Sequence, residues 1–516
     1  MDCRGTDLPP FPERQHGAEV VMSKRSQPVL GRRAGRSALL AALVTSAAMA
    51  ADVREKPSQI GSRLTLFLDR ELIAGMKHAA LRLHSPIPRG VVFAFDQAWE
   101  GGQSAYVTVL KDGRRFRMYY RGGGDLGREC TCMAESDDGI HWVRPKLGLF
   151  EHAGSKDNNI VWTGRWKAYD ECHNFSPFID SNPAAGPEER YKAVTLARPG
   201  EGEQKRNVLV AFVSADGIHW RRLQDAPIIT DGAFDSHNTA FWDVARRQYV
   251  CFLRASQQGK KSIARTTSPD FVHWGKSELL SFGDTPIEHF YTNGIVTYFR
   301  APEVYLGFPM RFIHPRDRDT IGFKPRKTDG FSDAVFMSSR DGRHWDRTFM
   351  EAMIRPGLDP KNWGGAHGNS TPSWGIVQTG DTELSIYWAE HYDNYPAEEI
   401  MPRLQRGTFR LDGFISVNAP YAGGEMVTRP LVFSGSSLAI NYSTSAPGSV
   451  KVEIQDAEGL PIPDFALDDC LAIWGDEIER TVAWKKGSDV SALAGTPVRL
   501  RFVMVDADLY SIRFRP

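Results

Sequence analysis

Acidic side chains recur just upstream of the first strand in four successive β-rich units of this chain. They are Asp96 and Glu100, Glu171, Asp235, and Glu288. Cleavage of a glycosidic bond needs such groups, because one carboxylic acid protonates the leaving oxygen while a second carboxylate attacks the sugar or activates water. We therefore expect these acids, Glu171 aside, to converge on one pocket as the catalytic residues.

The residues around two of these acids suggest separate roles. Ile287 and Phe290 would desolvate Glu288 and favour its protonated form, so Glu288 is the candidate general acid. Asp235 would then be the base or nucleophile, and an acid of the first unit would orient the substrate. Glu171 is a candidate for holding substrate hydroxyl groups.

A small polar residue begins the innermost strand of each unit. These residues are Ser104, Asn174, Asn238, Asn293 and Asn369, and histidines directly precede two of them, as His173 and His237. The innermost strands of a β-propeller all begin at the same end of the central channel, so these side chains should form a ring at one mouth. Buried polar rings need partners or a ligand. The alternative for each asparagine is a local role, because asparagine readily bonds nearby backbone groups.

Further candidates for substrate binding lie at the ends of the second strands and before the fifth unit. They are Arg121, Arg254, Arg311, Glu390, His391 and Trp363. The three arginines could clamp a carboxylate or sulfate, which would indicate a sialidase-like enzyme for an anionic glycan. They could instead pair with the acids upstream of the innermost strands.

A heptapeptide of the form Ser-x-Asp-Gly-x-His-Trp sets the architecture that must position these residues. Copies occupy 136–142, 214–220, 268–274 and 339–345, and a faded fifth copy without Trp lies at 411–414. The pattern is that of a hairpin turn, in which Asp folds back onto backbone N–H groups, Gly accepts a positive φ and Trp closes the turn. We interpret these Asp and His residues as structural.

Each heptapeptide closes a unit of strand, turn, strand and strand, as the four-stranded blade of a propeller requires. Five such units fill residues 86–419. From about residue 420 to 516, apolar and polar residues alternate between Gly and Pro turns, which is typical of a small antiparallel sandwich. The sequence thus predicts an all-β protein, a five-bladed β-propeller followed by a small C-terminal β-sandwich, with 51–85 as a lead-in.

The first fifty residues read as a leader and signal peptide. Arg32, Arg33 and Arg36 precede an apolar run at 37–47, which ends in a small-residue cleavage site, Ala48-Met49-Ala50. We expect cleavage after Ala50 and a secreted or periplasmic protein. The apolar run is too short to remain as a membrane anchor, so no membrane insertion is expected after its removal.

The overall composition narrows the range of partners and cofactors. Lys+Arg and Asp+Glu are both 63 among 516 residues, so no net field favours nucleic acid as a partner. The six cysteines are scattered, without the spacing of a zinc site, and one bridge is the most we expect. We expect no cofactor and no metal site among the candidates, with a structural calcium ion as an open alternative.

The blade count, the turns, the upstream acids and the trailing sandwich together resemble the superfamily of glycoside hydrolase families 32 and 43, in an uncharacterised branch of secreted bacterial members. The resemblance covers nearly all of the mature chain. It implies a carbohydrate substrate and a site of three acids from separate blades: a nucleophile or base, a transition-state stabiliser and a general acid. The invertase-type Trp-Met-Asn-Asp-Pro-Asn start is absent, and only Phe95-Asp96 and Trp99-Glu100 stand nearby. The alternative reading is a non-catalytic carbohydrate-binding propeller, which would tolerate loss of any single acid.

Overall fold

The computed structural model describes residues 56–123, 129–166, 169–199, 206–314, 330–363, 369–392 and 401–516. In these ranges the chain forms β-strands joined by loops and short 3-10 helices, so the protein is all-β, as the sequence predicts. None of the described residues forms a helix of the length and apolarity that a membrane crossing needs. The expected signal peptide, residues 1–50, lies outside the described residues.

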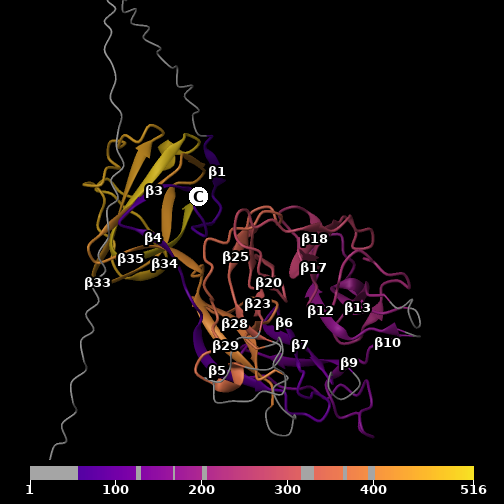
Figure 1. The fold of residues 1–516 in the computed structure, drawn as a ribbon. Helices are drawn as coiled ribbons and strands as arrows, with labels where there is room; N and C mark the ends of the chain where they lie inside the picture. The colour runs from indigo at the N-terminus through magenta and orange to yellow at the C-terminus, as the bar shows by residue number, and fades with distance from the viewer. Residues whose placement is uncertain are drawn as a thin grey trace, which may run out of the picture. The chain divides into compact units, whose positions relative to one another are not determined.

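Three successive four-stranded antiparallel sheets correspond to the first three predicted blades (Figure 1). Their strands are β6 (Ala105–Asp112), β7 (Arg115–Gly122), β8 (Cys130–Ser136) and β9 (Ile160–Trp162); β12 (His173–Ile179), β13 (Tyr191–Ala197), β14 (Val208–Ser214) and β15 (Arg221–Arg222); and β16 (Thr239–Asp243), β17 (Gln248–Gln257), β18 (Lys260–Ser268) and β19 (Glu278–Leu279). Each sheet is a simple meander, because every strand pairs with its neighbours in the sequence.

The fourth group of strands is split into two three-stranded sheets. One contains β21 (Val296–Tyr298), β22 (Ala301–Gly307) and β25 (Met337–Ser339), and the other β20 (His289–Phe290), β23 (Met310–Ile313) and β24 (Phe331–Ala334). The break between β22 and β23 falls at Phe308-Pro309, and proline cannot donate a hydrogen bond to a sheet ladder. This group stands where the sequence predicts the fourth blade.

The fifth group takes one strand from the other end of the chain. It contains β26 (Thr371–Pro372), β27 (Val377–Gly380), β28 (Glu383–Glu390) and β29 (Arg403–Arg410), and β5 (Ile87–Ala94) pairs antiparallel with β29. The first and fifth groups also touch at their inner strands, where Trp374 N–H donates to Val107 O and Val109 N–H donates to Trp374 O, both at 2.8 Å. The five groups are consistent with a closed propeller of five blades, and we number the blades in this order.

The repeated heptapeptides form one recurring turn. In the first copy, Asp138 Oδ1 accepts the N–H groups of Ile140 and His141 at 2.8 Å, and its other oxygen lies 2.7 Å from His141 Nδ1. The other three copies repeat these bonds at Asp216, Asp270 and Asp341. Burial alone would raise the pKa of each Asp, but the hydrogen bonds outweigh it and hold the pKa well below the usual range.

Tyrosines on the second strands tie each blade to the one before it. The OH of Tyr249 donates to Asp180 Oδ2 at 2.7 Å, from the third blade to the second. The same relationship recurs between Tyr191 and Asp112 and between Tyr305 and Asp243. Since these groups are largely buried, each bond stabilises the junction between two blades.

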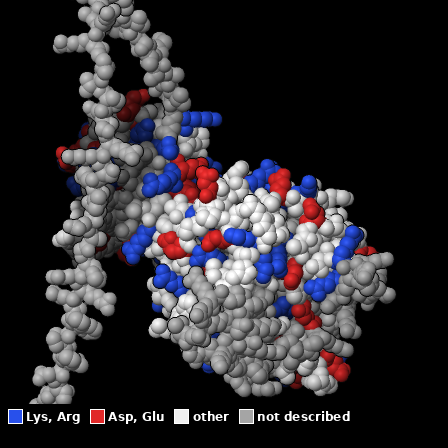
Figure 2. Space-filling model, viewed as in Figure 1, with Lys and Arg blue, Asp and Glu red and all other residues white. Residues whose placement is uncertain are grey.

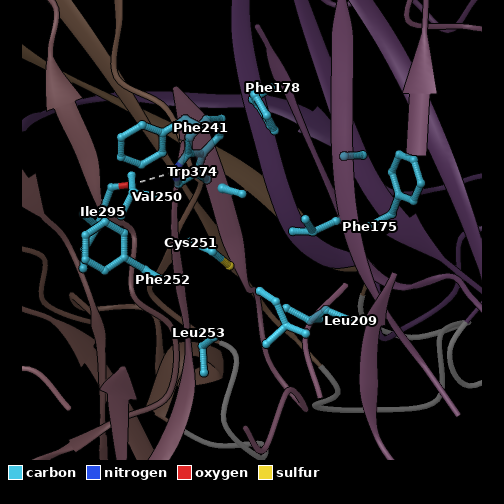
Figure 3. Close-up of a cluster of buried hydrophobic side chains, with 14 of the residues drawn as sticks. Phe175, Phe178, Leu209, Phe241, Val250, Cys251, Phe252, Leu253, Ile295 and Trp374 are labelled. Atoms are coloured by element: carbon cyan, nitrogen blue, oxygen red, sulfur yellow. Dashed lines mark hydrogen bonds between the residues drawn. The ribbon is translucent and has the colours of Figure 1, made fainter. Parts of the chain in front are cut away.

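Apolar side chains from several blades meet along the inner strands (Figure 3). Phe175, Phe241, Phe252 and Trp374 belong to this buried cluster, and Trp374 Nε1–H donates to Ile295 O at 2.7 Å. Burying an aromatic side chain of this kind stabilises the fold by roughly 2 kcal/mol. This core fixes the inner strands and hence the side chains at their first residues.

A ten-stranded sheet holds both chain termini of the described region and is consistent with the predicted sandwich. Its strands are β1 (Ser58–Gly61), β2 (Thr65–Leu66), β3 (Ile73–Lys77), β4 (Ala80–Leu83), β30 (Ile415–Ala419), β31 (Gly424–Thr428), β32 (Leu431–Phe433), β33 (Ser437–Asp456), β34 (Asp476–Thr481) and β35 (Val498–Arg515). Strands β1 to β4 fall in the stretch that the sequence assigns to the lead-in, yet each pairs with a strand of the C-terminal part. A short pair, β10 (Arg165–Trp166) and β11 (Tyr169–Asp170), completes the strands.

The described cysteines, which are Cys130, Cys132, Cys172, Cys251 and Cys470, are all free and buried. They pack as small apolar side chains, and burial raises the pKa of the Cys251 thiol. Within the described ranges no group of three or more His, Cys, Asp or Glu side chains is arranged to hold a metal ion.

Candidate active site

The inner strands of four blades begin with a backbone distortion. Tyr106, Asn174, Gly294 and Ser370 have φ values of 55°, 60°, 54° and 55°. The pairing register of β6 with β7 shifts between Ala105 and Thr108, and that of β12 with β13 shifts just after His173. Bulges and positive φ at non-glycine residues concentrate at functional sites, where they re-aim side chains.

Nine side chains gather at these strand starts and form what we call the central cluster. They are Tyr106, Arg121 and Glu129 of the first blade, His173 and Asn174 of the second, Asp235 and Arg254 of the third, Tyr291 of the fourth and Tyr392 of the fifth. Because every blade contributes, the cluster lies where the inner strands converge.

His173 bridges two carboxylates in this cluster. Its Nδ1 lies 2.9 Å from both oxygens of Glu129, and its Nε2 lies 3.0 Å from Asp235 Oδ1. Burial alone would lower the pKa of His173, but its hydrogen bonds to Asp235 and Glu129 raise it above the usual value. The hydrogen bond from His173 in turn holds the pKa of Asp235 well below its usual range. The three groups therefore favour an imidazolium between two ionised carboxylates.

Asp235 is the carboxylate of the cluster that remains accessible. Its side chain is 48% exposed, against 20% for Glu129. Arg254 Nη1 lies 3.4 Å from Asp235 Oδ2 and also donates to the Asp235 carbonyl. The guanidinium of Arg254 stands 4.9 Å from the ring centre of Tyr291. Asp235 is thus ionised, oriented from two sides and open to solvent.

Arg121 is the buried anchor of the cluster. It donates to Asn174 Oδ1 at 3.1 Å and to the Tyr392 OH at 2.6 Å, and its guanidinium lies 4.6 Å from the ring centre of Tyr106. The Nδ2 group of Asn174 is buried and has no hydrogen-bond partner among the described residues. A buried, unpaired amide beside a fixed cation is a group that a bound ligand could satisfy.

The ring of Tyr106 contacts two aromatic neighbours. It meets Tyr392 edge-on at 6.4 Å and His237 edge-on at 6.0 Å between ring centres. His237 Nε2 lies 3.3 Å from Thr108 Oγ1. Burial and the nearby charge of Arg121 lower the pKa of His237 to about 3, so this predicted binding residue is a neutral, buried group.

Three of the predicted acids are engaged by two arginines. Glu100 is fully buried, and Arg144 Nε and Nη2 donate to its two oxygens at 2.9 Å. The same guanidinium lies 3.1 Å from Asp96 Oδ1. Glu171 is also fully buried and is bound by Arg222.

Glu288 lies between two arginines. Arg311 Nη1 donates to its Oε1 at 2.8 Å, and Arg347 donates to its Oε2. Arg311 also binds Asp333 through Nε and Nη2, at 2.9 and 2.6 Å. Both oxygens of Glu288 therefore accept hydrogen bonds from guanidinium groups.

Three of the predicted asparagines tie backbone segments together. Asn238 donates to Phe234 O at 2.7 Å and accepts the N–H of Arg254 at 3.0 Å. Asn293 donates to His237 O at 2.8 Å, and the side chain of Asn369 accepts the N–H of Tyr392 at 2.9 Å. The local alternative for asparagine fits these three positions, whereas Asn174 faces Arg121 in the central cluster.

The predicted residues of the fifth blade form a network of their own. His391 Nε2 lies 2.8 Å from Asp359 Oδ2, and Arg403 bridges Asp359 and Glu390 at 3.0 and 2.8 Å. Trp363, which is 39% exposed, lines a cavity of about 1090 Å³ together with Glu288 and Arg311.

Sequence reasoning missed Glu129 and the three tyrosines of the cluster. Glu129 comes just before β8, a third strand, so it lies outside the register of residues that precede the inner strands. Tyr106 lies two positions after Ser104, whereas Tyr291 lies two positions before Asn293. Because the two offsets have opposite signs, no common spacing marks these tyrosines in the sequence.

Charges of both signs are interspersed over the described residues on the face shown in Figure 2. Blue and red patches alternate, as expected for 63 basic and 63 acidic residues. A surface of this kind steers neither polyanions nor polycations over long range. Recognition must therefore depend on local groups such as those of the central cluster.

No protein-family model matches the sequence, and no curated protein matches it. Similar solved structures include an N-acetylgalactosamine deacetylase from F. plautii in complex with blood group B trisaccharide, with 14% identity over 64% of this chain and 96% of that chain and a TM-score of 0.44. A family 43 arabinoxylan arabinofuranohydrolase from Bacillus subtilis shows 12% identity over 81% and 96% with a TM-score of 0.36. A family 32 β-fructofuranosidase from Bombyx mori shows 11% identity over 83% and 94% with a TM-score of 0.41. The latter two carry the names of the families that the sequence resembles, but likenesses at this level say nothing about the roles of residues.

Proposed function

We propose that this protein is a secreted glycoside hydrolase that acts at the central cluster, with Asp235 as its nucleophile or base. The observation that carries the proposal is the state of Asp235: a half-exposed carboxylate whose pKa is held low by the hydrogen bond from His173, at the point where five blades converge. An ionised carboxylate in that position can attack an anomeric carbon while the glycosidic C–O bond breaks, or it can take the proton of a water molecule that attacks this carbon. In both cases the departing oxygen takes its proton from solvent water.

The other groups of the cluster support this role by holding Asp235 in place. His173 and Arg254 engage different oxygens of the carboxylate, so its orientation is set before a substrate arrives. The rings of Tyr106, Tyr291 and Tyr392 are buried beside the guanidinium groups of Arg121 and Arg254, and they help to fix these two cations. Arg121 is committed to protein groups and keeps the cluster rigid.

Glu288 is not part of this proposal as a proton donor, because two guanidinium groups occupy its oxygens. Its pairing with Arg311, like that of Asp235 with Arg254, also weighs against an arginine clamp for an anionic group. The clamp would need guanidinium groups that are free to meet a ligand.

A sugar-binding propeller without catalysis is the second candidate, and one observation favours it. Three of the predicted acids, Glu100, Glu171 and Glu288, are buried or largely buried and engaged by arginines, whereas the side chains of Asp96 and Asp235 are about half exposed. An accessible carboxylate can orient a sugar by accepting hydrogen bonds from its hydroxyl groups, without any catalysis.

One experiment separates the two candidates. Mature protein and the Asp235→Asn variant are incubated with a panel of plant and algal glycans, and released sugar is measured. The hydrolase proposal predicts product from at least one glycan and a loss of ~1000-fold or more in turnover for Asp235→Asn. Asp284→Asn, at an exposed aspartate, is the matched control. Binding without product, or equal turnover by Asp235→Asn, would overturn the catalytic role.

A further inference from the structure

The cavity that Trp363 lines is separate from the central cluster and has a different chemistry. Its volume is about 1090 Å³, and its walls come from Glu288, from β23 and β24, and from the segment 352–363. Its charged lining residues are Glu288, Arg311, Asp333 and Arg355. A cavity of this size accommodates a sugar residue with its neighbours.

Trp363 presents a fixed aromatic surface at this cavity. Its Nε1–H donates to Gly357 O at 2.7 Å, and Phe331 meets its ring edge-on at 6.4 Å. The loop beneath it is held by its own bonds, since Asn362 donates to Pro356 O at 3.0 Å. The ring is therefore oriented in advance, while 39% of the side chain stays accessible for stacking.

The acids of the cavity are already satisfied by arginines. Arg311 and Arg347 occupy both oxygens of Glu288, and Arg311 occupies both oxygens of Asp333. Ser332 donates its hydroxyl to Asn369 O at 2.5 Å. Each oxygen of these acids thus already accepts a hydrogen bond from a guanidinium group, which leaves fewer acceptor sites for the hydroxyl groups of a neutral sugar.

Arg355 is the exception among the described lining residues. It is exposed, it lines the cavity beside Trp363, and no described residue hydrogen-bonds to it or pairs with it. The cavity thus combines an aromatic platform with one uncommitted guanidinium, whose planar fork matches a carboxylate or sulfate group.

We propose that this cavity is a binding subsite for an acidic sugar residue, which stacks on Trp363 and pairs its carboxylate or sulfate with Arg355. This subsite would make an anionic glycan the substrate class of the proposed hydrolase, so its role in catalysis rests on the proposed function. Ser332 binds Asn369, and Asn369 accepts the N–H of Tyr392 in the central cluster, so the cavity wall and the cluster share one hydrogen-bonded connection.

The test measures binding apart from turnover. Full-length mature protein carrying Asp235→Asn is titrated calorimetrically with tetragalacturonate, with a sulfated carrageenan tetrasaccharide and with neutral β-1,4-galactotetraose. We expect one of the two acidic oligosaccharides to bind at least tenfold more tightly than the neutral one, with an affinity that falls as salt is added. Comparison of the two acidic probes identifies carboxylate or sulfate as the group bound.

Variants assign the binding to this cavity. Arg355→Gln and Trp363→Ala should each weaken binding of the acidic probe at least tenfold, and Arg355→Lys should keep part of it. Arg114→Gln is the matched control, because Arg114 is exposed but does not line the cavity. Equal binding of the neutral probe, or unchanged affinity in both Arg355→Gln and Trp363→Ala, would overturn the subsite. Absence of product from the wild-type protein would instead count against the proposed catalysis.

Discussion

His173 Nε2 lies 3.0 Å from Asp235 Oδ1, so an imidazole of the second blade holds a carboxylate of the third. On its other side the same ring meets Glu129 of the first blade. Three blades thereby contribute one charged side chain each, in the order Glu129, His173 and Asp235, and the charge alternates in sign along this row. The position of Asp235 depends on the packing of these blades against one another, and not on its own loop alone.

The pairing of His173 should make stability depend on pH. Its pKa is raised in the folded protein, so its contribution is fully present below the unfolded value of about 6.5 and is lost as pH rises through the folded pKa. Compared with the wild type, His173→Gln should be less stable by about 1.5 kcal/mol near pH 6, and the difference should shrink at higher pH. Chemical denaturation between pH 5.5 and 9 measures this.

The exposed His78, changed to Asn, serves as the control for that series. A difference between wild type and His173→Gln that stays constant across the pH range would show that the imidazole acts through packing and not through its charge.

Changing Asp216 to Ala should weaken one blade without touching the site. The variant loses the two backbone hydrogen bonds to Oδ1 and the contact with His219, which should cost about 1 kcal/mol. Product release per folded molecule should stay at the wild-type level. A variant that melts like the wild type and releases no product would place Asp216 in the active site.

Removing the hydroxyl of Tyr249 should loosen the junction of the second and third blades. Tyr249→Phe leaves Asp180 with Lys192 at 2.8 Å but without the tyrosine bond, and we expect a loss of about 1 to 2 kcal/mol. Tyr421→Phe is the matched control, since Tyr421 is 71% exposed. Equal effects of the two substitutions on urea denaturation would argue that the bond to Asp180 contributes nothing.

Gly375 tests the contact between the first and fifth blades. Its φ is 106°, and a Cβ atom there would collide with the carbonyl oxygen of Val109. Gly375→Ala should therefore lower stability by about 2 kcal/mol or more. Gly186→Ala, where a Cβ atom meets nothing, should be close to neutral in the same thermal melts. Matching melting temperatures for the two variants would refute the tight approach of these strands.

Short sequence patterns predicted the features of this fold that depend on residues close together in the chain. The turns at Asp138 and Asp216 and the strands before them follow from Asp, Gly and Trp spacing, because such turns are made by bonds within a few residues. The sequence near β5 or β1 does not indicate that these strands pair with β29 and β32, because the partner strands lie hundreds of residues away.

The candidate site shows the same difference between contacts that the sequence could indicate and contacts that depend on distant residues. The shared register identified Asp235, His173 and Asn174, which do meet in the central cluster. The alternative that second-strand arginines pair with these acids fits Arg311 at Glu288. The register could not show that Arg144 holds Glu100 or that Arg347 also binds Glu288, because these arginines lie 44 and 59 residues further along the chain. Sequence therefore indicates which acids begin the blades, while folding decides which of them stay accessible.

The pairing of β5 with β29 joins residues such as Arg89 and Thr408, which are 319 positions apart. During synthesis β5 leaves the ribosome long before β29 has been made. The backbone hydrogen-bonding groups of β5 therefore stay unpaired while the first four blades form. The ring can close only after the last blade arrives. A permuted chain that begins at β6 and carries β5 after β29 should therefore close from neighbouring segments and fold faster.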